Sequence, residues 1–337
     1  MFHFAWNARL RRAREDCCIK WSSDCGLILP AMATLGVIAF SKPAIADCDV
    51  GTRVFVQTFT LDAPCVDDEL LLPSVSFQDE TEIITGELDK TITENFGVGL
   101  QEQWVQLKLP GEGTRSGFDN LQTQFNYQLV RNSKSETAMT AALVVNWGGT
   151  GNRAVGADPF TTLTPTWNGG QGFGFLPESM KFLRPFGITA ALGYSFPTES
   201  STTTFDEGSG LLATINNPQF LIWSGSLQYS MSYLKSKVQN LGLPEFVNHL
   251  NPIIEWDFQT QAQNFNGEAH TTGTINPGLV YLDDKIQFSL EAIIPMNSAS
   301  GDGVGVIGAL HFHTDKFFPH TLGKPIFGPA AQEGAED

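Results

Sequence analysis

The amino-acid sequence predicts an all-β protein, a closed antiparallel up-and-down transmembrane β-barrel of about 12 strands with short periplasmic helical segments. The first observation is a recurrent alternation of apolar and polar residues, the pattern of a strand with two different faces. The second is the length of these segments, roughly ten to fourteen residues against ~5–6 for a typical strand of a soluble protein. The third is an N-terminal export signal. Alternation alone leaves a soluble β-sandwich or soluble barrel open.

Residues 1–46 have the features of a secretory signal peptide. A region with four arginines precedes an uncharged run, 26–40, and the tripeptide Ala44-Ile-Ala46 matches the small-residue pattern before a cleavage site. The run is about fifteen residues long and contains Pro30 and Gly36, whereas a membrane-spanning helix needs ~20 apolar residues. These features favour cleavage before Asp47 over a transmembrane anchor.

The chain without residues 1–46 carries 14 basic and 33 acidic side chains, a formal charge of −19. A chain this acidic is a poor partner for nucleic acid or for anionic membrane surfaces. Cys48 and Cys65 are the cysteines that remain after residue 46. A disulfide between them would staple an N-terminal loop in an oxidising compartment, and the sequence leaves open whether it forms.

Alternating segments recur from residue 70 onward. In 120–130, for example, Leu121, Phe125 and Leu129 share one face, and the other face carries glutamine and asparagine. In a membrane barrel the apolar face meets lipid and the polar face lines the interior. The predicted strands are 70–78, 82–93, 96–109, 120–130, 136–147, 160–173, 185–197, 219–233, 252–261, 271–282, 285–296 and 303–313.

The connections are assigned to two sides of the membrane by counting strands from a periplasmic N-terminus. The longest linker, 198–218, is expected to be a structureless external loop that gates or filters the lumen. Segments 176–184 and 234–249 are expected to be briefly helical on the periplasmic side. The remaining external loops are 110–117, 148–159, 262–270 and 297–302.

Four prolines fall within or at the ends of these strands. Because proline removes a donor from the strand ladder, several of them are expected at strand ends or bulges; they are Pro165, Pro252, Pro277 and Pro295. The chain is thus divided into a signal peptide (1–46), an N-terminal periplasmic segment (47–69), a β-barrel (70–315) and a C-terminal extension (316–337).

Short motifs along nearly all of the exported chain carry a resemblance to a known family. They are DDELLLPSVSF at 67–77, ITENFGV at 92–98, WGGTG at 147–151, LRPF at 183–186, WSGSLQYSMSYLK at 223–235, TINPG at 274–278 and FPHTLGKPIF at 318–327. In these the chain resembles the transporter-like outer-membrane barrels named for the MetA pathway of phenol degradation. The resemblance implies an exported barrel that passes small, often aromatic or hydrophobic, compounds.

No enzyme motif is found, so the chain is not expected to be an enzyme. The segments nearest to a nucleophile elbow, 193–197 and 224–228, lack its flanking glycine and its strand-to-helix context. His311 and His313 project to the same side of a predicted strand and could bind a metal with His320 or Glu291. A role as polar lining residues is favoured for both histidines, and no metal or other cofactor is expected.

The polar faces are expected to line a narrow lumen. The predicted lining residues are Gln122, Gln124, Asn126, Gln128, Ser226, Gln228, Glu255, Asp257 and Glu291. An excess of carboxylates would favour cations over anions. The alternative for the three acidic residues is a set of salt bridges with Lys285, Arg131 or Arg184.

The sequence therefore predicts an outer-membrane channel or transporter for the passive passage of small molecules, with the lipid bilayer and the permeant as its partners. Barrels of eight strands are filled by side chains and those of sixteen or more hold an aqueous channel, so about 12 strands leave the open or plugged state undecided. The oligomeric state is also undecided. Two alternatives remain, a non-conducting structural or adhesive outer-membrane barrel and a soluble exported β-protein that binds a small ligand.

Overall fold

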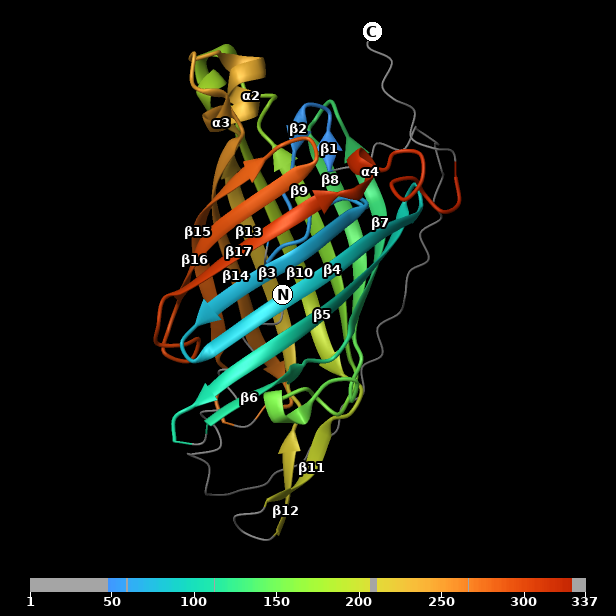
Figure 1. Cartoon of the computed structure of the whole chain (residues 1–337), viewed down its shortest axis with the longest axis vertical. Coiled ribbons are helices and arrows are strands. Elements are labelled where there is room, and N and C mark those ends of the chain that lie inside the picture. The colour runs from blue at the N-terminus through green and yellow to red at the C-terminus, as the bar shows by residue number, and fades with distance from the viewer. Residues whose placement is uncertain (1–47, 59, 112, 207–210, 266, 329–337) are drawn as a thin grey trace.

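The computed structural model describes residues 48–328 except 59, 112, 207–210 and 266, so the predicted signal peptide lies outside the described residues. Within this range twelve antiparallel strands close into a barrel, because the last strand pairs with the first (Figure 1). The strands are β3 (Glu69–Gln78), β4 (Thr81–Thr93), β5 (Phe96–Leu109), β7 (Gln122–Asn132), β8 (Thr137–Asn146), β9 (Thr162–Gly172), β10 (Phe186–Pro197), β13 (Gln219–Tyr229), β14 (Leu250–Gln263), β15 (Thr271–Leu282), β16 (Ile286–Pro295) and β17 (Gly305–His313). The predicted fold class is confirmed.

Most strands have one apolar, exposed face and one buried face rich in polar or small residues, although β8 buries Ala138, Ala142 and Val144. On β14, Glu255 and Asp257 are buried, whereas Ile254 is exposed. On β16, Gln287 and Ser289 are buried, whereas Phe288 and Leu290 are exposed. The polar faces therefore point into the barrel, which reverses the arrangement of a soluble protein with an apolar core.

Proline positions differ from the expectation. Pro165, Pro252 and Pro277 lie within strands, and only Pro295 ends one. The β9–β10 pairing is interrupted at Pro165 and the β15–β16 pairing at Pro277, yet the register is the same on both sides of each gap. A long ladder keeps its register when one donor is missing, because the neighbouring pairs still fix it.

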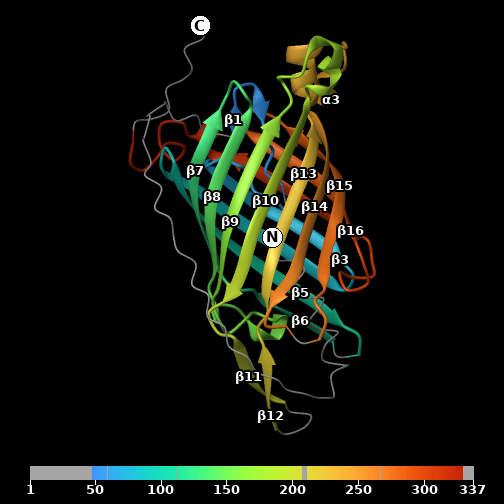
Figure 2. The same cartoon turned by 180° about the vertical axis from the view of Figure 1, so that it is seen from behind.

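The two ends of the barrel carry different structures. At one end, here called the helix end, lie α2 (Met231–Tyr233), a π-turn (Leu234–Val238), α3 (Glu245–Asn248), α4 (Thr314–Phe317) and a 3-10 turn (Glu178–Leu183). Figure 2 shows α3 beyond the strands and β11 and β12 at the opposite end, here called the hairpin end. In the part of the chain that the structure describes, no helix is long and apolar enough to cross a membrane.

Strand β13 ends earlier than the predicted segment 219–233. Ser230 starts a helical turn there, and its side chain accepts a hydrogen bond from the backbone N–H of Tyr233. Serine is a favoured residue at a helix N-terminus for this reason. Tyr233 therefore lies in α2 and not on the outer face of a strand.

Two predicted external loops contain strands. Residues 113–118 form β6 (Gly113–Phe118), which pairs with β5. The segment 198–218 contains a hairpin of β11 (Ser201–Asp206) and β12 (Leu211–Asn216), so the expectation of a structureless linker is wrong. Its threonine-rich strands have high β-propensity, which the polar composition of the segment obscured. The hairpin extends beyond the barrel (Figures 1 and 2), which does not fit the predicted gate or filter.

The chain after β17 returns to the wall. After α4, the backbone N–H groups of Ile326 and Phe327 donate hydrogen bonds of 3.2 and 2.8 Å to the carbonyl oxygens of Thr91 and Ile92. Residues 326 and 327 of the predicted C-terminal extension are thus attached to the end of β4.

Candidate functional site: a plugged lumen

Residues 48–68, here called the plug segment, run through the lumen. They contain two short paired strands at the helix end, β1 (Asp49–Val50) and β2 (Arg53–Val54) (Figure 1). Most of the described residues of the segment are buried. The sequence placed this segment on the periplasmic side, and the structure places it inside the barrel.

Polar side chains from strands on several sides of the ring hold the plug segment. Gln124 of β7 donates to the Asp62 carboxylate at 2.8 Å, and Gln128 accepts from the backbone N–H of Val66 at 3.0 Å. Across the lumen, Glu255 of β14 accepts a hydrogen bond of 2.9 Å from Thr60. Further contacts come from Gln228 on β13 to Val54 and Val56, Gln287 on β16 to Gln57, and Lys90 and Thr91 on β4 to Asp68. A segment that touches β4, β7, β13, β14 and β16 can lie only between them.

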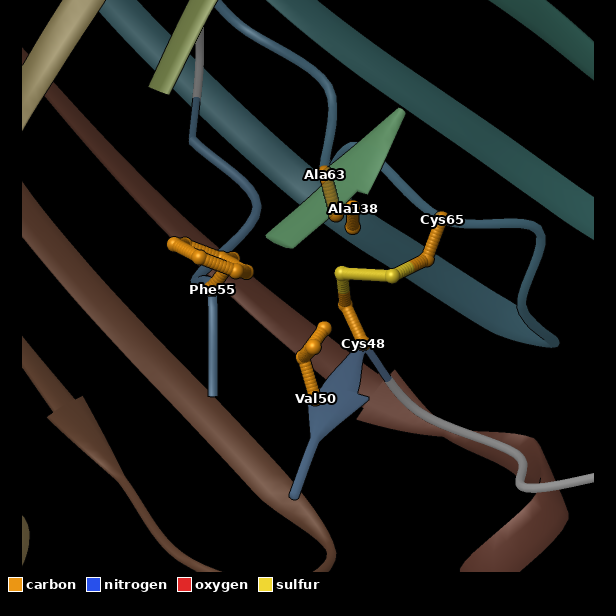
Figure 3. Packing of buried hydrophobic residues seen from close by; sticks show 6 residues of the cluster. All are labelled: Cys48, Val50, Phe55, Ala63, Cys65 and Ala138. Atoms are coloured by element: carbon orange, nitrogen blue, oxygen red, sulfur yellow. A yellow bond between two sulfur atoms is a disulfide. The ribbon is translucent and has the colours of Figure 1, made fainter. Parts of the chain in front are cut away.

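A disulfide and a small apolar cluster give the plug segment a core of its own. Cys48 and Cys65 are joined, with their Cα atoms 5.3 Å apart. Figure 3 shows them beside Val50, Phe55 and Ala63, with Ala138 contributed by β8. A disulfide that closes a loop of about 15 residues stabilises by about 3 kcal/mol. The plug segment is therefore a compact folded unit within the lumen.

Glycines in the inner wall make room for the plug segment. A Cβ atom at Gly170 would lie 2.7 Å from Pro64 and 3.1 Å from the Phe55 ring, and one at Gly97 would lie 2.7 Å from Val66. Real Cβ atoms essentially never come within 3.0 Å of another heavy atom, so a larger residue at either position would have to displace Pro64 or Val66. The wall and the plug segment are complementary in shape.

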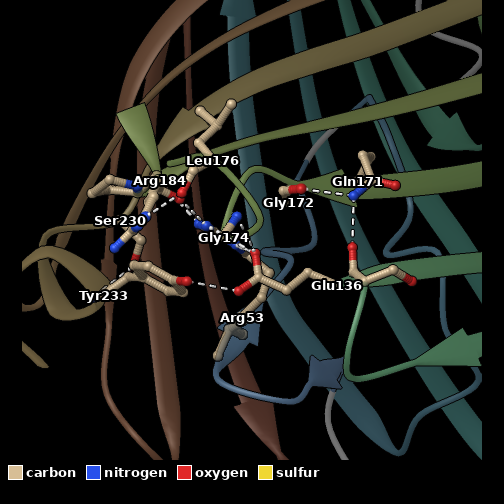
Figure 4. Close-up of polar contacts among 12 residues, drawn as sticks. Arg53, Glu136, Gln171, Gly172, Gly174, Leu176, Arg184, Ser230 and Tyr233 are labelled. Carbon is tan, nitrogen blue, oxygen red and sulfur yellow. Dashed lines mark hydrogen bonds and ion pairs between the residues drawn. The ribbon is translucent and has the colours of Figure 1, made fainter. Parts of the chain in front are cut away.

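A buried ion pair closes the helix end of the plug segment. Arg53, which is 0% exposed, donates from Nε and Nη2 to Glu136 Oε2, both at 3.3 Å, and from Nη1 to the Pro185 carbonyl oxygen at 2.7 Å. The Tyr233 hydroxyl donates to Glu136 Oε1 at 2.8 Å, and the Arg53 guanidinium lies 4.2 Å from the centre of the Tyr233 ring. Figure 4 shows this group, with the backbone of Gly174 donating to Glu136 at 3.1 Å.

Electrostatic effects differ between the members of this group. Burial lowers the pKa of Arg53, and the Glu136 carboxylate opposes that change. Burial, together with the hydrogen bond to Glu136, raises the pKa of Tyr233 to about 12. Tyr233 is therefore a neutral donor over the ordinary pH range, and Glu136 is the acceptor shared by both groups.

Every predicted lining residue lies on an inward face. Gln122, Gln124, Gln128, Ser226, Gln228, Glu255, Asp257 and Glu291 are buried, and Asn126 is half-buried. In this conformation, however, Gln124, Gln128, Gln228 and Glu255 bind the plug segment. Sequence reasoning missed Arg53, Glu136 and Tyr233, which lie far apart in the sequence. The series of small inward residues, including Gly97 and Gly170, was the available signal that something fills the lumen.

The expected basic partners of the acidic residues lie elsewhere. Arg131 donates to the backbone oxygen of Asp49, Arg184 pairs with Glu178, and the Lys285 amine lies over the Phe317 ring. Among the described residues, none of these three basic side chains therefore forms the alternative salt bridges with Glu255, Asp257 and Glu291. Asp257 instead accepts a hydrogen bond of 2.7 Å from Ser224.

The two candidate metal-binding histidines point into the barrel, and His311 is paired with the Glu69 carboxylate through Nδ1. His320 is exposed. Among the described residues, no group of three or more His, Cys, Asp or Glu side chains is arranged to hold a metal ion.

The plug segment leaves a small polar cavity against β3, β4, β5, β7 and β8. Its volume is about 30 Å³, enough for a few water molecules and too small for an organic solute. The cavity is lined by Thr58, Thr60, Asp62, Leu71, Ser74, Thr85, Glu87, Gln101, Gln103, Gln122, Gln124 and Val144. The described side chains thus fill most of this part of the lumen.

No protein-family model and no curated protein sequence matches the chain. Among solved structures it is similar to the KdgM porin, with 10% identity, a TM-score of 0.45, and coverage of 72% of this chain and 98% of the porin. It is similar to the NanC porin at 8% identity and a TM-score of 0.46, covering 73% and 98% of the two chains. An outer-membrane channel from Pseudomonas putida F1 has 10% identity, a TM-score of 0.49, and coverage of 72% and 93%.

Proposed function

We propose that the protein is an outer-membrane β-barrel channel for the passive passage of small molecules, in which the plug segment must move to open the path. The observation that carries this proposal is a closed wall with a polar inner face around a segment that contributes no strand to the wall. A folded unit that can leave without breaking the ring of strands is what a gated pore requires.

The outer face supports a location in a lipid bilayer. Large apolar side chains are exposed around the barrel, for example Trp167 at 57% and Leu290 at 50%. A soluble protein rarely exposes an apolar surface of more than a few hundred Å². Aromatic residues also form outward cross-strand pairs near the helix end, namely Phe96–Tyr127, Phe186–Tyr229 and Tyr281–Phe288. Aromatic girdles are typical of membrane barrels at the bilayer surface. These features weigh against the soluble alternative.

The charge of the inner wall indicates which charge the permeant should carry. Buried carboxylates at Glu87, Asp89, Glu255, Asp257 and Glu291 give an opened lumen a negative field, which favours cations and neutral solutes over anions. The resemblance to the phenol-degradation barrels adds aromatic compounds to the proposed permeants. Swelling of protein-containing liposomes compares the entry of a neutral aromatic solute (phenol), a neutral sugar (arabinose) and an anion (gluconate). Faster entry of gluconate than of the two neutral solutes would contradict the proposed selectivity.

Single-channel conductance in a planar bilayer tests the proposal. The exported chain is compared with a truncated chain that begins at Glu69, which lacks the plug segment and both cysteines but keeps all twelve strands. We expect rare openings from the former and a steady current from the latter. A control that replaces 202–215 with two glycines shortens the β11–β12 hairpin outside the lumen, and its current should equal that of the full chain.

The plug segment also favours a second candidate, a non-conducting structural or adhesive barrel. Its disulfide and its hydrogen bonds on several sides of the lumen would suit a permanent filling. The truncated chain separates the two functions. Heat-dependent mobility in gel electrophoresis first shows whether the truncated chain folds. If the folded truncated chain conducts and the untruncated chain never does, the barrel is a filled scaffold. If neither chain conducts, the pore proposal is wrong.

A further inference from the structure

Two carboxylates on different strands meet in the inner wall. Glu255 lies on β14 and Glu291 on β16, and their carboxyl groups are within hydrogen-bonding distance although β15 separates the two strands. Gly278 of β15 makes this contact geometrically possible, because it is the residue paired with Glu291. A Cβ atom at Gly278 would lie 2.2 Å from Cγ of Glu291. The Glu291 side chain therefore crosses over Gly278 toward β14.

This pair is buried and poor in hydrogen-bond donors. Glu255 is 0% exposed and Glu291 is 1% exposed. Thr60 of the plug segment donates to Oε2 of Glu255, and Thr58 also lies beside Glu255, but its hydroxyl donates to the Leu61 carbonyl oxygen. In the part of the chain that the structure describes, Oε1 of Glu255 and both carboxylate oxygens of Glu291 have no hydrogen-bond donor. Among the described residues, neither carboxylate forms an ion pair with a basic side chain.

Two neutral side chains at neighbouring ladder positions also have buried oxygen atoms without a hydrogen-bond partner among the described residues. Asn276 is directly opposite Glu255 in the β14–β15 ladder, is 1% exposed, and has no donor for its Oδ1 atom. Directly opposite residues on one face have Cβ atoms about 4.5–5.5 Å apart. Ser289, two residues before Glu291 on the same face, has a buried hydroxyl without a partner. Buried acceptors without donors need partners, which can be ordered water or an ion, and two adjacent buried carboxylates also need their charge compensated.

A shared proton does not meet this need. One proton between Glu255 and Glu291 joins two oxygen atoms and leaves the others, including Oδ1 of Asn276, without a donor. A divalent cation neutralises both carboxylates and accepts several oxygen ligands at once. Calcium fits better than magnesium, because it takes 6–8 oxygen ligands in flexible geometry, whereas magnesium keeps much of its water.

We propose that Glu255 and Glu291, with the Asn276 side-chain oxygen, form a calcium-binding site in the barrel wall, next to Thr60 of the plug segment. The site contains two carboxylates and neutral oxygens, so it differs from the clusters of three or more acidic or histidine side chains that define most metal centres. Calcium binding can be measured without transport, and this proposal is therefore tested separately from the proposed channel.

Isothermal titration calorimetry of the full exported chain in an uncharged detergent tests the site with calcium chloride. We expect one calcium ion per chain for the unaltered protein. Glu291→Gln removes a charged ligand, and Gly278→Ala keeps both carboxylates but displaces Glu291; each should weaken binding at least tenfold. Asp284→Asn removes one charge from an exposed turn and should change the affinity less than twofold.

Thermal unfolding provides a second measurement on the same variants. With a chelator present, Glu291→Gln should unfold at a higher temperature than the unaltered chain, because it removes a buried charge that has no partner. Added calcium should raise the unfolding temperature of the unaltered chain and not that of the variant. The proposal is overturned if the unaltered chain binds no calcium, or if it and the Glu255→Gln/Glu291→Gln double variant bind calcium equally.

Discussion

The guanidinium of Arg53 and the carboxylate of Glu136 form a buried ion pair in which two nitrogen atoms donate to one oxygen atom, both at 3.3 Å. Arg53 belongs to the plug segment, and Glu136 immediately precedes β8. Removing one partner of a buried pair costs about 3–5 kcal/mol, because it leaves the other charge buried without compensation. This contact is therefore expected to control how often the plug segment leaves the helix end.

Glu136→Gln should expose Arg53. We expect trypsin to cleave after Arg53 about a hundredfold faster in the folded variant, because a loss of about 3 kcal/mol raises the open population by that order. Because the Cys48–Cys65 disulfide holds the two products together, the digest is reduced first, and mass spectrometry of the fragment that ends at Arg53 measures the rate. Glu178→Gln is the control, since Glu178 forms exposed ion pairs with Lys181 and Arg184 that contribute little. Equal cleavage of the two variants would contradict the assigned role of Glu136.

Tyr233 should ionise far above the ordinary range of tyrosine. Burial and the hydrogen bond to Glu136 raise its pKa to about 12, against about 10 in an unfolded chain. Since the folded state favours the neutral form, its contribution to stability is complete below pH ~10 and is lost as the pH rises toward 12. The absorbance of tyrosinate in the unaltered chain minus that in Tyr233→Phe isolates this group. A midpoint near pH 10 would show that the hydroxyl does not lie against Glu136.

Gly170→Val should loosen the plug segment without changing a charge. The added side chain would collide with Pro64 and Phe55, and overpacking of this kind typically costs 1–3 kcal/mol. We expect more frequent channel openings and faster trypsin cleavage after Arg53. Gly169→Val is a matched control on the adjacent outward position, where the nearest atom to an added Cβ is 3.9 Å away. The same increase in both variants would rule out direct displacement of the plug segment.

Leu290→Arg should destabilise the barrel in lipid. Leu290 is 50% exposed on the outer face near the middle of β16. An arginine at the bilayer midplane costs about 2–4 kcal/mol in a membrane barrel. Thr203→Arg places the same side chain on the β11–β12 hairpin and should leave stability unchanged. Urea unfolding in lipid vesicles measures both, and equal stability of the two variants would contradict a lipid-facing position for Leu290.

The strands were predictable because alternation is a local property of the sequence. The segment predicted at 96–109 coincides with β5 (Phe96–Leu109), and that at 271–282 coincides with β15 (Thr271–Leu282). The inward position of Glu255 followed from the same rule, since a register shift of one residue would exchange the two faces. At Ser230 a helix-capping signal competed with the alternation, and the predicted end of the strand at residue 233 was therefore wrong.

The position of the plug segment could not be predicted in the same way. Val50, Phe55, Val56 and Leu61 show no regular period in 48–68, and the partners that hold them are remote in sequence. Gln228, for example, contacts Val54 and Val56 across more than half of the chain. Such contacts depend on the closed barrel, and a single sequence contains no local pattern that reports them.

The ring of strands is completed by the pairing of β3 with β17, in which Phe77 lies opposite Val306. This pairing is the seam between the first and the last strand of the barrel, and loop-closure entropy makes so distant a pairing slow to form. The plug segment is continuous with β3, so it is already tethered at the seam when the seam closes. If the seam closes last, the tethered plug segment is enclosed as the ring forms, and no disulfide-bonded loop has to be threaded through a finished barrel.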